Sequence, residues 1–205
     1  MATDAEQKPA ERDPTVLVLL AAGAGSRFAG PHHKLTADLG GRSVAERSVS
    51  AALAAGIGPV VVVTGAVELP VPDRPDLHVV SNPDWAAGQS TSLRAGIVAA
   101  ERLGADAIVV GLADQPFIEP EAWRRVAAAT SPIAVATYGG KRRNPVRLHR
   151  DIWPLLPTSG DEGARSLMRV RSDLVEEVPC EGSPADIDTL EDLRTWQNRS
   201  STNSP

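Results

Sequence analysis

A continuous apolar run from Thr15 to Leu20 leads directly into a glycine-rich segment. A strand that is apolar at every position, rather than at every second one, is typical of the centre of a parallel sheet that is covered on both faces. Further apolar runs rich in β-branched residues alternate with segments in which alanine, leucine and arginine follow a helical period. This order predicts βαβ units, and therefore an α/β domain whose central sheet is mostly parallel.

The other strands and helices are expected from the same two periods and from turn and capping residues. We expect strands over Pro59–Thr64, Leu77–Ser81, Ala107–Leu112, Ile133–Tyr138 and Leu174–Pro179, with a basic turn at Gly139–Arg143. We expect helices from a cap at Ser43 to Ala55, from Ser90 or Thr91 to Gly104, over Pro120–Ala129, Ile152–Leu156 and Ala164–Val170, and from Thr189 to Trp196.

Residues 14–197 are expected to form one domain. With 205 residues and an apolar content of 42%, the chain is long enough to bury a single core, and no internal repeat is visible. Residues 1–13 are polar and charged, and residues 198–205 are rich in serine and asparagine. Such segments lack the apolar side chains that offset ordering entropy, so both ends are expected to be disordered tails.

Charge and composition exclude several classes of function. The chain carries 21 basic and 26 acidic residues, a net charge of −5, and so has no broad cationic surface that would bind nucleic acid. Its single cysteine, Cys180, excludes an intramolecular disulfide and a cysteine-rich metal site, and is expected to pack as a small hydrophobic residue. The longest apolar stretch, Val16–Ala22, is too short to span a membrane. No signal peptide is visible, so we expect a cytoplasmic protein.

The segment after the first apolar run has the composition of a phosphate-binding loop. Small residues over positions 21–26 let consecutive backbone N–H groups approach phosphate oxygens, and Arg27 and Lys34 can neutralise a polyphosphate. Two common motifs are absent, because Phe28 stands where a dinucleotide-binding loop needs its third glycine and no Gly-Lys-Ser/Thr sequence is present. The alternative is a flexible connector, which would need neither the arginine nor the lysine.

Two acidic segments offer metal ligands. Asp114 follows a buried run directly, and ligands of open α/β sheets bind beyond the carboxyl ends of the strands. A carboxylate there can hold Mg²⁺, which prefers one or two carboxylates plus phosphate oxygens, and Asp186 or Asp188 can complete the site. The alternative is a turn or helix-capping role, and this is the role that we expect for Asp192.

Two polar segments and one basic segment also suit ligand binding. The amide and hydroxyl groups of Asn82–Leu93 fit the edge of a nucleobase and its ribose, and the alternative is an ordinary helix cap. The turn Gly160–Arg165 can bind an anion, and the alternative is capping by its aspartate. Arg142, Arg143 and Arg147 form either a patch for an anionic acceptor or a solvated face.

Taken together, these stretches resemble the MobA/MocA-type nucleotidyltransferases, in particular the molybdenum cofactor cytidylyltransferase branch. The resemblance is carried by the LAAGAGSRF loop with Lys34, by Asn82, Trp85, Gly88 and Ser92, and by the segments Leu112–Pro116, Gly160–Arg165 and Asp186–Thr189. It covers Val16 to about Leu193. The resemblance implies a Rossmann-like, three-layer α/β nucleotidyltransferase fold. It also implies a nucleoside triphosphate bound with Mg²⁺, for which Mn²⁺ can substitute, and nucleotidyl transfer to a phosphate with release of pyrophosphate.

The resemblance also implies roles for individual residues. It gives catalytic roles to Arg27, Lys34 and Asp114, and metal binding to Asp114 and Asp188. The nucleotide-binding residues that it implies are Ala21, Ala22, Gly23, Gly25, Ser26, Arg27, Lys34, Asn82, Gly88 and Ser92. The acceptor-binding residues that it implies are Asn144, Asp161 and Arg165.

The form of the loop bears on the substrates. Ala21-Ala22-Gly23 resembles the cytidylyl enzymes, whereas guanylyl enzymes tend to carry Ala-Gly-Gly, so CTP is preferred over GTP. The implied acceptor is the terminal phosphate of molybdopterin, and a molybdoenzyme apoprotein is a candidate partner. The chain departs from the branch at Asn144, in Arg143-Asn144-Pro145, where the branch usually has Gly-His-Pro. The alternatives are GTP as donor, a sugar or polyol phosphate as acceptor, and a nucleotide-binding module without catalysis.

Overall fold

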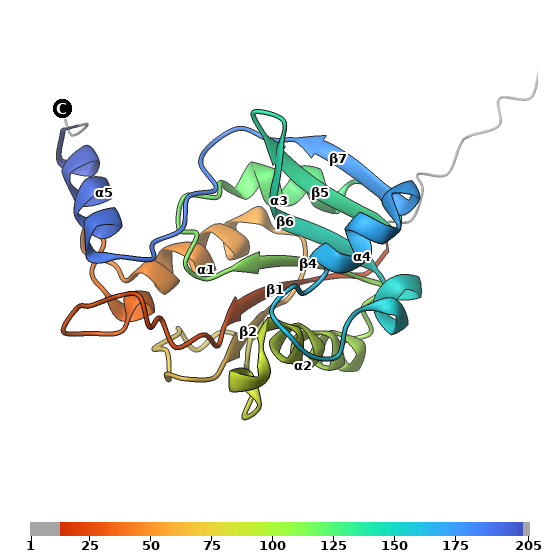
Figure 1. Ribbon diagram of the computed structural model, residues 1–205, viewed down its shortest axis with the longest axis horizontal. Helices are drawn as coiled ribbons and strands as arrows, with labels where there is room; N and C mark the ends of the chain where they lie inside the picture. The colour runs from red at the N-terminus through yellow and green to blue at the C-terminus, as the bar shows by residue number, and fades with distance from the viewer. Residues whose placement is uncertain (1–12, 203–205) are drawn as a thin grey trace, which may run out of the picture.

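The structure, a computed structural model, describes residues 13–202 and has one seven-stranded sheet (Figure 1). The strands are β1 (Thr15–Ala21), β2 (Val60–Thr64), β3 (Leu77–Ser81), β4 (Ala107–Leu112), β5 (Ile133–Tyr138), β6 (Lys141–His149) and β7 (Val175–Pro179). They lie in the order β3-β2-β1-β4-β6-β5-β7. All neighbours are parallel except β6, which runs antiparallel to both β4 and β5. The predicted mostly parallel α/β sheet is therefore confirmed.

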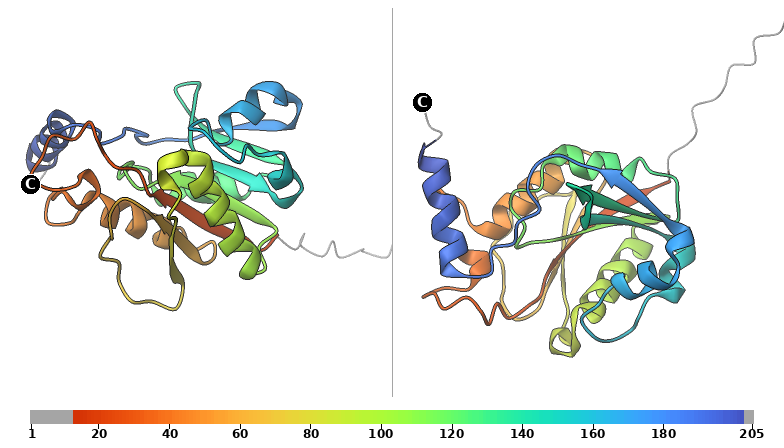
Figure 2. Two further views of the ribbon diagram at one scale, coloured as in Figure 1. Left: turned by 60° about the horizontal axis from the view of Figure 1, so that its bottom comes forward. Right: turned by 45° about the horizontal axis from the view of Figure 1, so that its top comes forward.

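Helices cover both faces of the sheet, so the predicted three-layer arrangement is confirmed (Figure 2). The α-helices are α1 (Val44–Ala55), α2 (Gln89–Arg102), α3 (Pro120–Ala127), α4 (Arg165–Val170) and α5 (Leu190–Thr202). Four short 3₁₀ helices are η1 (Lys34–Thr36), η2 (Trp85–Ala87), η3 (Arg150–Leu155) and η4 (Ser172–Leu174). Side chains of α1, α3 and α5 contribute to the core on one face, and side chains of α2, η3 and α4 contribute to the core on the other.

The two cores explain why β1 is apolar at every position. Leu17 and Leu19 belong to the core on the α1 side, whereas Val16, Val18 and Leu20 belong to the core on the α2 side. All five side chains are buried. Full burial of an aliphatic side chain contributes about 1.5–3 kcal/mol, so a polar residue on either face of β1 would destabilise the fold.

The limits of α1 follow from its capping residues, as the sequence predicts. The Ser43 hydroxyl accepts a hydrogen bond from the Glu46 N–H, and the Glu46 carboxylate accepts one from the Ser43 N–H. The helix ends at Gly56, whose φ of 64° is left-handed and favours glycine.

The strand β6 was not predicted, and only Gly139 and Gly140 of the expected basic turn form a turn. The segment carries successive basic residues and Pro145, which are depleted in strands. The structure accommodates the proline in a bulge: Val135 pairs with Val146 but Ala136 pairs with Arg143, so residues 144 and 145 have no partner in β5. Asn144 therefore lies in an irregular part of β6, where it has no pairing partner in β5.

Several predicted limits are also wrong. The helix α2 begins at Gln89 after Gly88, so neither Ser90 nor Thr91 is its N-cap. The helix α3 ends at Ala127, two residues earlier than expected. The helix α5 runs to Thr202, so residues 198–202 continue a helix instead of belonging to the expected tail. Of the expected N-terminal tail, residues 1–12 lie outside the described residues.

The contacts of Asp13 and Arg147 contradict two further predictions from the sequence. Asp13, placed in the tail by its sequence context, accepts a hydrogen bond of 2.7 Å from Arg147. Arg147 is 2% exposed and also donates to the Ser131 carbonyl, because its side chain points toward the start of β1. It is therefore neither part of an acceptor patch nor part of a solvated face.

The topology places a crevice beside β1. The chain passes from β1 to β2 and β3 on one side and then returns to β4 on the other side of β1. Open α/β sheets bind ligands at such a switch point, beyond the carboxyl ends of the strands. The glycine-rich loop after β1 and the turn containing Asp114 after β4 both lie there.

Candidate active site

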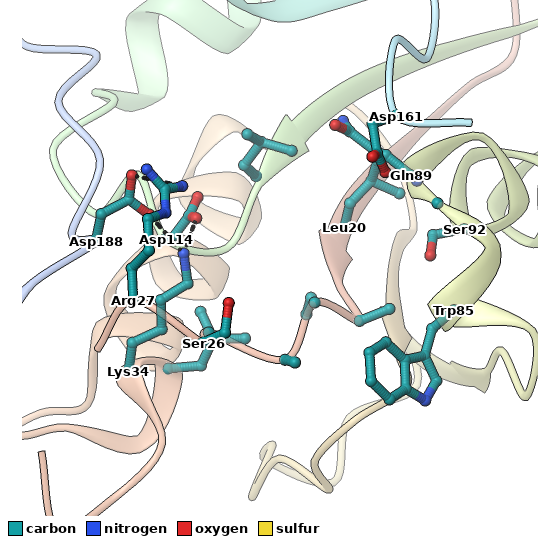
Figure 3. Close-up of a pocket in the computed structure, with 18 of the residues that line it drawn as sticks. Leu20, Ser26, Arg27, Lys34, Trp85, Gln89, Ser92, Asp114, Asp161 and Asp188 are labelled. Carbon is teal, nitrogen blue, oxygen red and sulfur yellow. Dashed lines mark hydrogen bonds and ion pairs between the residues drawn. The ribbon is translucent and has the colours of Figure 1, made fainter. Parts of the chain in front are cut away.

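A cavity of about 510 Å³ opens at this switch point (Figure 3). Its walls are the loop after β1, the start of α2, the turn after β4, and the residues around Asp161 and Asp188. It brings together Asp114, Asp188 and every residue expected to bind nucleotide except Asn82. Trp85, Gln89, Leu112 and a few other side chains complete the lining.

The loop after β1 presents free backbone donors. The N–H groups of residues 23–26 donate to no backbone or side-chain acceptor within the described part of the chain. Gly25 has a φ of 61°, and a Cβ there would lie 3.1 Å from both Lys34 Cγ and His33 Nε2. The His33 ring lies 3.1 Å from the Gly23 carbonyl through Nε2 and accepts the Leu35 N–H at Nδ1. Because Nδ1 is an acceptor, Nε2 carries the proton and donates to the loop.

Lys34 lies at the centre of an ion-pair cluster (Figure 3). Its Nζ donates to Asp114 Oδ2 at 2.6 Å and to Asp188 Oδ1 at 2.9 Å, and Arg27 Nη2 lies 3.0 Å from Asp188 Oδ2. Burial alone would lower the pKa of Lys34, but the attraction of Asp114 and the hydrogen bonds to both carboxylates raise it above the usual value. Lys34 is therefore protonated at neutral pH.

Backbone and capping contacts hold the two carboxylates together. The Ile187 N–H donates to the Asp114 carbonyl at 2.8 Å, and the Ile187 side chain is fully buried. Asp192 accepts hydrogen bonds from the N–H groups of Asp188 and Thr189, and Thr189 Oγ1 accepts the Asp192 N–H. Asp192 therefore has the capping role that the sequence predicts.

The donor set of the cavity fits a divalent cation that is bound together with phosphates. Asp114 Oδ1 is buried and has no hydrogen-bond partner among the described residues. The described lining holds two cations and three carboxylates, so a polyphosphate would need further positive charge. Two carboxylates suit Mg²⁺ when phosphate oxygens complete the shell. No cluster of three or more acidic, histidine or cysteine side chains that would bind a metal without such a ligand occurs within residues 13–198.

The other end of the cavity is suited to a base and sugar. Figure 3 shows Trp85, Ser92 and Gln89 across the cavity from the Lys34 cluster, with the loop of Ser26 between the two groups. Trp85 offers an aromatic ring, and Ser92 and Gln89 offer a hydroxyl and an amide group. Trp85 was noted in the motif but not predicted as a site residue, although aromatic side chains are a common signal for stacking on bases.

Asn82 supports this region from behind. It is buried, its Nδ2 lies 2.9 Å from Thr91 Oγ1 and 3.0 Å from Ser92 Oγ, and its Oδ1 accepts the Asp84 N–H. It therefore holds the hydroxyl of Ser92 in place and does not itself line the cavity.

Gly88 and Asp161 form the junction at the start of α2. Gly88 has a φ of 111°, and a Cβ there would lie 2.5 Å from the Gly160 carbonyl carbon. Asp161 Oδ1 accepts the Gln89 N–H at 3.3 Å, and the Gly160 carbonyl accepts the Ser90 N–H. Asp161, expected to bind the acceptor, thus caps α2 and lines the first cavity.

A second cavity of about 490 Å³ adjoins the first and shares Leu20 and Gln89 with it. Asn144 and Arg165, both expected to bind the acceptor, line this cavity, as do Arg142 and Arg143. Asp186 lines it as well, so Asp186 and Asp188 do not serve the same cavity. Gln115, which the sequence analysis did not single out, lies between Asn144 and Asp186.

The sequence matches one protein family and is similar to two named relatives. Residues 17–178 match the family described as the MobA-like NTP transferase domain. Nicotine blue oxidoreductase of Paenarthrobacter nicotinovorans is 33% identical over 192 residues, which cover 86% of this chain and 93% of that protein. Purine catabolism protein PucB of Bacillus subtilis (strain 168) is also 33% identical over 192 residues, which cover 85% of this chain and 92% of that protein.

Solved structures are similar over nearly the whole chain. A nucleotidyl transferase from Methanothermobacter thermautotroptrophicus (Mth528) gives a TM-score of 0.76 at 27% identity, over 93% of this chain and 99% of that one. Rv0371c of Mycobacterium tuberculosis H37Rv in complex with manganese gives a TM-score of 0.68 at 26% identity, over 90% of this chain and 98% of that one. Within the described residues, no helix is long and apolar enough to cross a membrane.

Proposed function

The chain belongs to the MobA-like NTP transferase family, and on this premise we propose that it transfers CMP from CTP to the terminal phosphate of molybdopterin. Its relatives support the coarser statement that it is a nucleotidyltransferase of the MobA/MocA type. The observation that carries the proposal is the cavity in which free N–H groups of the loop, the Lys34 cation and two carboxylates meet. A nucleoside triphosphate with a divalent cation has the charges to match this arrangement.

The proposed reaction needs no protein nucleophile. An oxygen of the acceptor phosphate attacks the α-phosphorus of CTP, a new P–O bond forms, and the bond between the α-phosphorus and the bridging oxygen breaks. Pyrophosphate leaves with the electron pair. The protein aligns the two phosphates and stabilises the charge on the leaving group. Arg27, Lys34 and the N–H groups of the loop would supply this stabilisation.

Asp114 and Asp188 would hold Mg²⁺, and Mn²⁺ can substitute for it. The three carboxylates of the cavity add to the negative charge of a bound triphosphate, and two side-chain cations cannot balance it. Bound with the triphosphate, the ion would neutralise part of this charge. The buried, unpartnered Asp114 Oδ1 supports this assignment, and a relative of known structure is described as a manganese complex.

The second cavity would hold the acceptor. It adjoins the first at Leu20 and Gln89, so a phosphate held there can reach the α-phosphorus of a nucleotide in the first cavity. Arg142, Arg143 and Arg165 suit an anionic acceptor. We propose that the product is then passed to a molybdoenzyme apoprotein.

Reduction of a substrate is a rival function, because one relative is named as an oxidoreductase. An oxidoreductase that binds a dinucleotide would need a dinucleotide-binding loop, yet Phe28 stands at the third glycine position of such a loop. The ion-pair cluster around Lys34 favours a triphosphate and a metal ion. Nucleotidyl transfer therefore remains the better supported function.

The test is pyrophosphate release with Mg²⁺, comparing CTP, GTP and ATP as donors and comparing molybdopterin with sugar and polyol phosphates as acceptors. We expect release with CTP, and a loss on the order of 10²–10³ in rate for Asp114→Ala. The matched control is Asp173→Ala, which removes an exposed carboxylate that pairs with Arg171. Release with GTP alone would mean that the protein transfers GMP and not CMP. Release only with a sugar or polyol phosphate would overturn the acceptor, and CTP binding without release would favour a nucleotide-binding module.

A further inference from the structure

The second cavity contains a chain of three polar side chains with a fixed direction. Gln115 Nε2 donates to Asp186 Oδ1 at 2.8 Å and lies 3.3 Å from the Pro184 carbonyl oxygen. Asn144 Nδ2 donates to Gln115 Oε1 at 3.0 Å. All three side chains line the cavity, and Gln115 is only 4% exposed.

The orientation of both amides follows from the chemistry of the acceptors at the end of this chain. A backbone carbonyl only accepts hydrogen bonds, so the Pro184 carbonyl fixes which end of the Gln115 amide faces it. The NH₂ group of Gln115 must therefore face Pro184 and Asp186, which leaves its carbonyl oxygen facing Asn144. Reversing the buried Gln115 amide would place its oxygen against two acceptors, which is costly in a buried site.

The orientation of the Gln115 amide fixes the orientation of the Asn144 amide. Because Gln115 Oε1 can only accept, Asn144 must turn its NH₂ group inward. Its Oδ1 accepts no hydrogen bond from the described residues. This side chain lies on the cavity wall together with Val146 and Leu148. The cavity thus presents a hydrogen-bond acceptor of fixed polarity.

The side chains around Asn144 limit the kinds of ligand that the second cavity can bind. The apolar part of the wall is aliphatic and is made by Leu93, Val110, Val135, Val146, Leu148 and Met168. Four arginines and two acidic residues, Glu162 and Asp186, make its charged part. A flat heterocycle can pack on the aliphatic wall, and a phosphate suits the excess of arginines. The Asn144 oxygen pairs only with a hydrogen-bond donor, and a ring N–H is the donor that such a heterocycle offers.

We infer that Asp186, acting through Gln115, fixes Asn144 as the hydrogen-bond acceptor that selects an N–H-bearing heterocycle as the phosphate acceptor of this enzyme. Asn144 is the specificity-determining residue, and Gln115 and Asp186 are positioning residues. The inference rests on the proposed function, because it identifies the class of acceptor that the second cavity takes. It also accounts for an asparagine at this position, since its amide combines an inward donor with an outward acceptor.

The test compares a pterin phosphomonoester with its analogue in which the ring amino group is replaced by hydrogen. Binding is measured by the change in pterin fluorescence, so the readout does not require turnover. We expect the wild-type protein to bind the amino compound roughly three- to tenfold more tightly, as one net hydrogen bond allows. Asn144→Ala should bind both compounds equally, and Gln115→Met should lose the preference because Asn144 is then free to reverse.

Asp186→Asn is the conservative control. The new amide can still offer an oxygen to Gln115 Nε2, and the Pro184 carbonyl still accepts, so the preference should persist. Thermal unfolding of each variant checks that the buried Gln115 site still folds. A wild-type preference that survives in Asn144→Ala or in Gln115→Met would overturn the inference. Equal binding of both compounds by the wild type, or binding of neither, would also overturn it.

Failure of the inference and failure of the proposed function give different results. If the wild-type protein releases pyrophosphate with molybdopterin but shows no preference for the amino group, only the inference is wrong. If it shows the preference in binding but transfers no nucleotide, the proposed function is wrong and the ligand class stands.

Discussion

Lys34 Nζ lies 2.6 Å from Asp114 Oδ2, and the same ammonium group also pairs with Asp188. One side-chain cation thus pairs with two carboxylates that come from distant parts of the sequence. A divalent cation would need oxygens that Lys34 now engages. Lys34 and the metal ion therefore compete for the carboxylates, unless a triphosphate arrives to draw the ammonium group toward its own oxygens.

The first prediction concerns Lys34→Met. Without the ammonium group Asp114 loses its ion-pair partner and Asp188 keeps only Arg27, so affinity for Mn²⁺ in the absence of nucleotide should rise on the order of tenfold. Turnover should fall on the order of 10²–10³, because a charge that stabilises the leaving group is lost. Manganese binding is measured by electron paramagnetic resonance.

Lys141→Met serves as the control, because Lys141 is an exposed lysine outside the cavity. It should change neither Mn²⁺ binding nor turnover. Unchanged Mn²⁺ affinity in Lys34→Met would contradict the competition between lysine and metal.

The second prediction concerns the dependence of stability on pH. The pKa of Lys34 is raised above 10.5 by Asp114 and Asp188, against the effect of burial. A raised pKa of a base contributes stability that is fully present below the unfolded pKa and is lost as pH rises through the folded pKa. Urea unfolding should therefore show a constant difference between wild type and Lys34→Met from about pH 7 to about pH 9. The difference should shrink only above pH 10.5. A decline near neutral pH would rule out this explanation.

The third prediction compares two glycines of positive φ. At Gly104, with a φ of 75°, a Cβ meets no atom within 4 Å, so Gly104→Ala should cost only about 1–2 kcal/mol of backbone strain. At Gly88 a Cβ would also overlap the Gly160 carbonyl carbon at 2.5 Å. Gly88→Ala should therefore cost more and should also weaken nucleotide binding, because it separates α2 from the segment of Asp161. Equal losses of stability, measured by thermal unfolding, would argue against a required close approach.

The fourth prediction concerns Cys180, the single cysteine of the chain. The residue is 9% exposed, and burial raises the pKa of its thiol, with Arg125 acting in the opposite direction. Because the thiolate is the reactive form, an aromatic disulfide reagent should label the folded protein slowly and the urea-unfolded protein rapidly. Rapid labelling of the folded protein would show that this part of the core opens.

Local signals in the sequence were enough to predict much of the fold. The apolar run of β1 predicted a strand covered on both faces, and Ser43 and Gly56 predicted both ends of α1. Asp114 was found because it follows a buried strand directly. In each case, the signal and the structure that it predicts lie within a few residues of each other.

Features that depend on distant residues were missed. The strand β6 exists because β4 and β5 flank it, and this overrides the unfavourable Pro145 and its basic neighbours. The cap of α2 comes from Asp161 on another segment, so Ser90 and Thr91 misled the prediction. The direction of the Gln115 and Asn144 amides depends on Pro184 and Asp186, and no spacing in the sequence records such contacts.

The most direct measurement follows the labelled phosphorus of CTP. Wild-type protein is incubated with Mg²⁺, molybdopterin and CTP labelled at either the α- or the γ-phosphate, and the products are separated. The account predicts that the α label enters the molybdopterin product while the γ label appears only in pyrophosphate, and that Asp114→Ala slows both changes on the order of 10²–10³. Transfer of the γ label to the acceptor, or α-label transfer by Asp114→Ala at the wild-type rate, would contradict nucleotidyl transfer at this site.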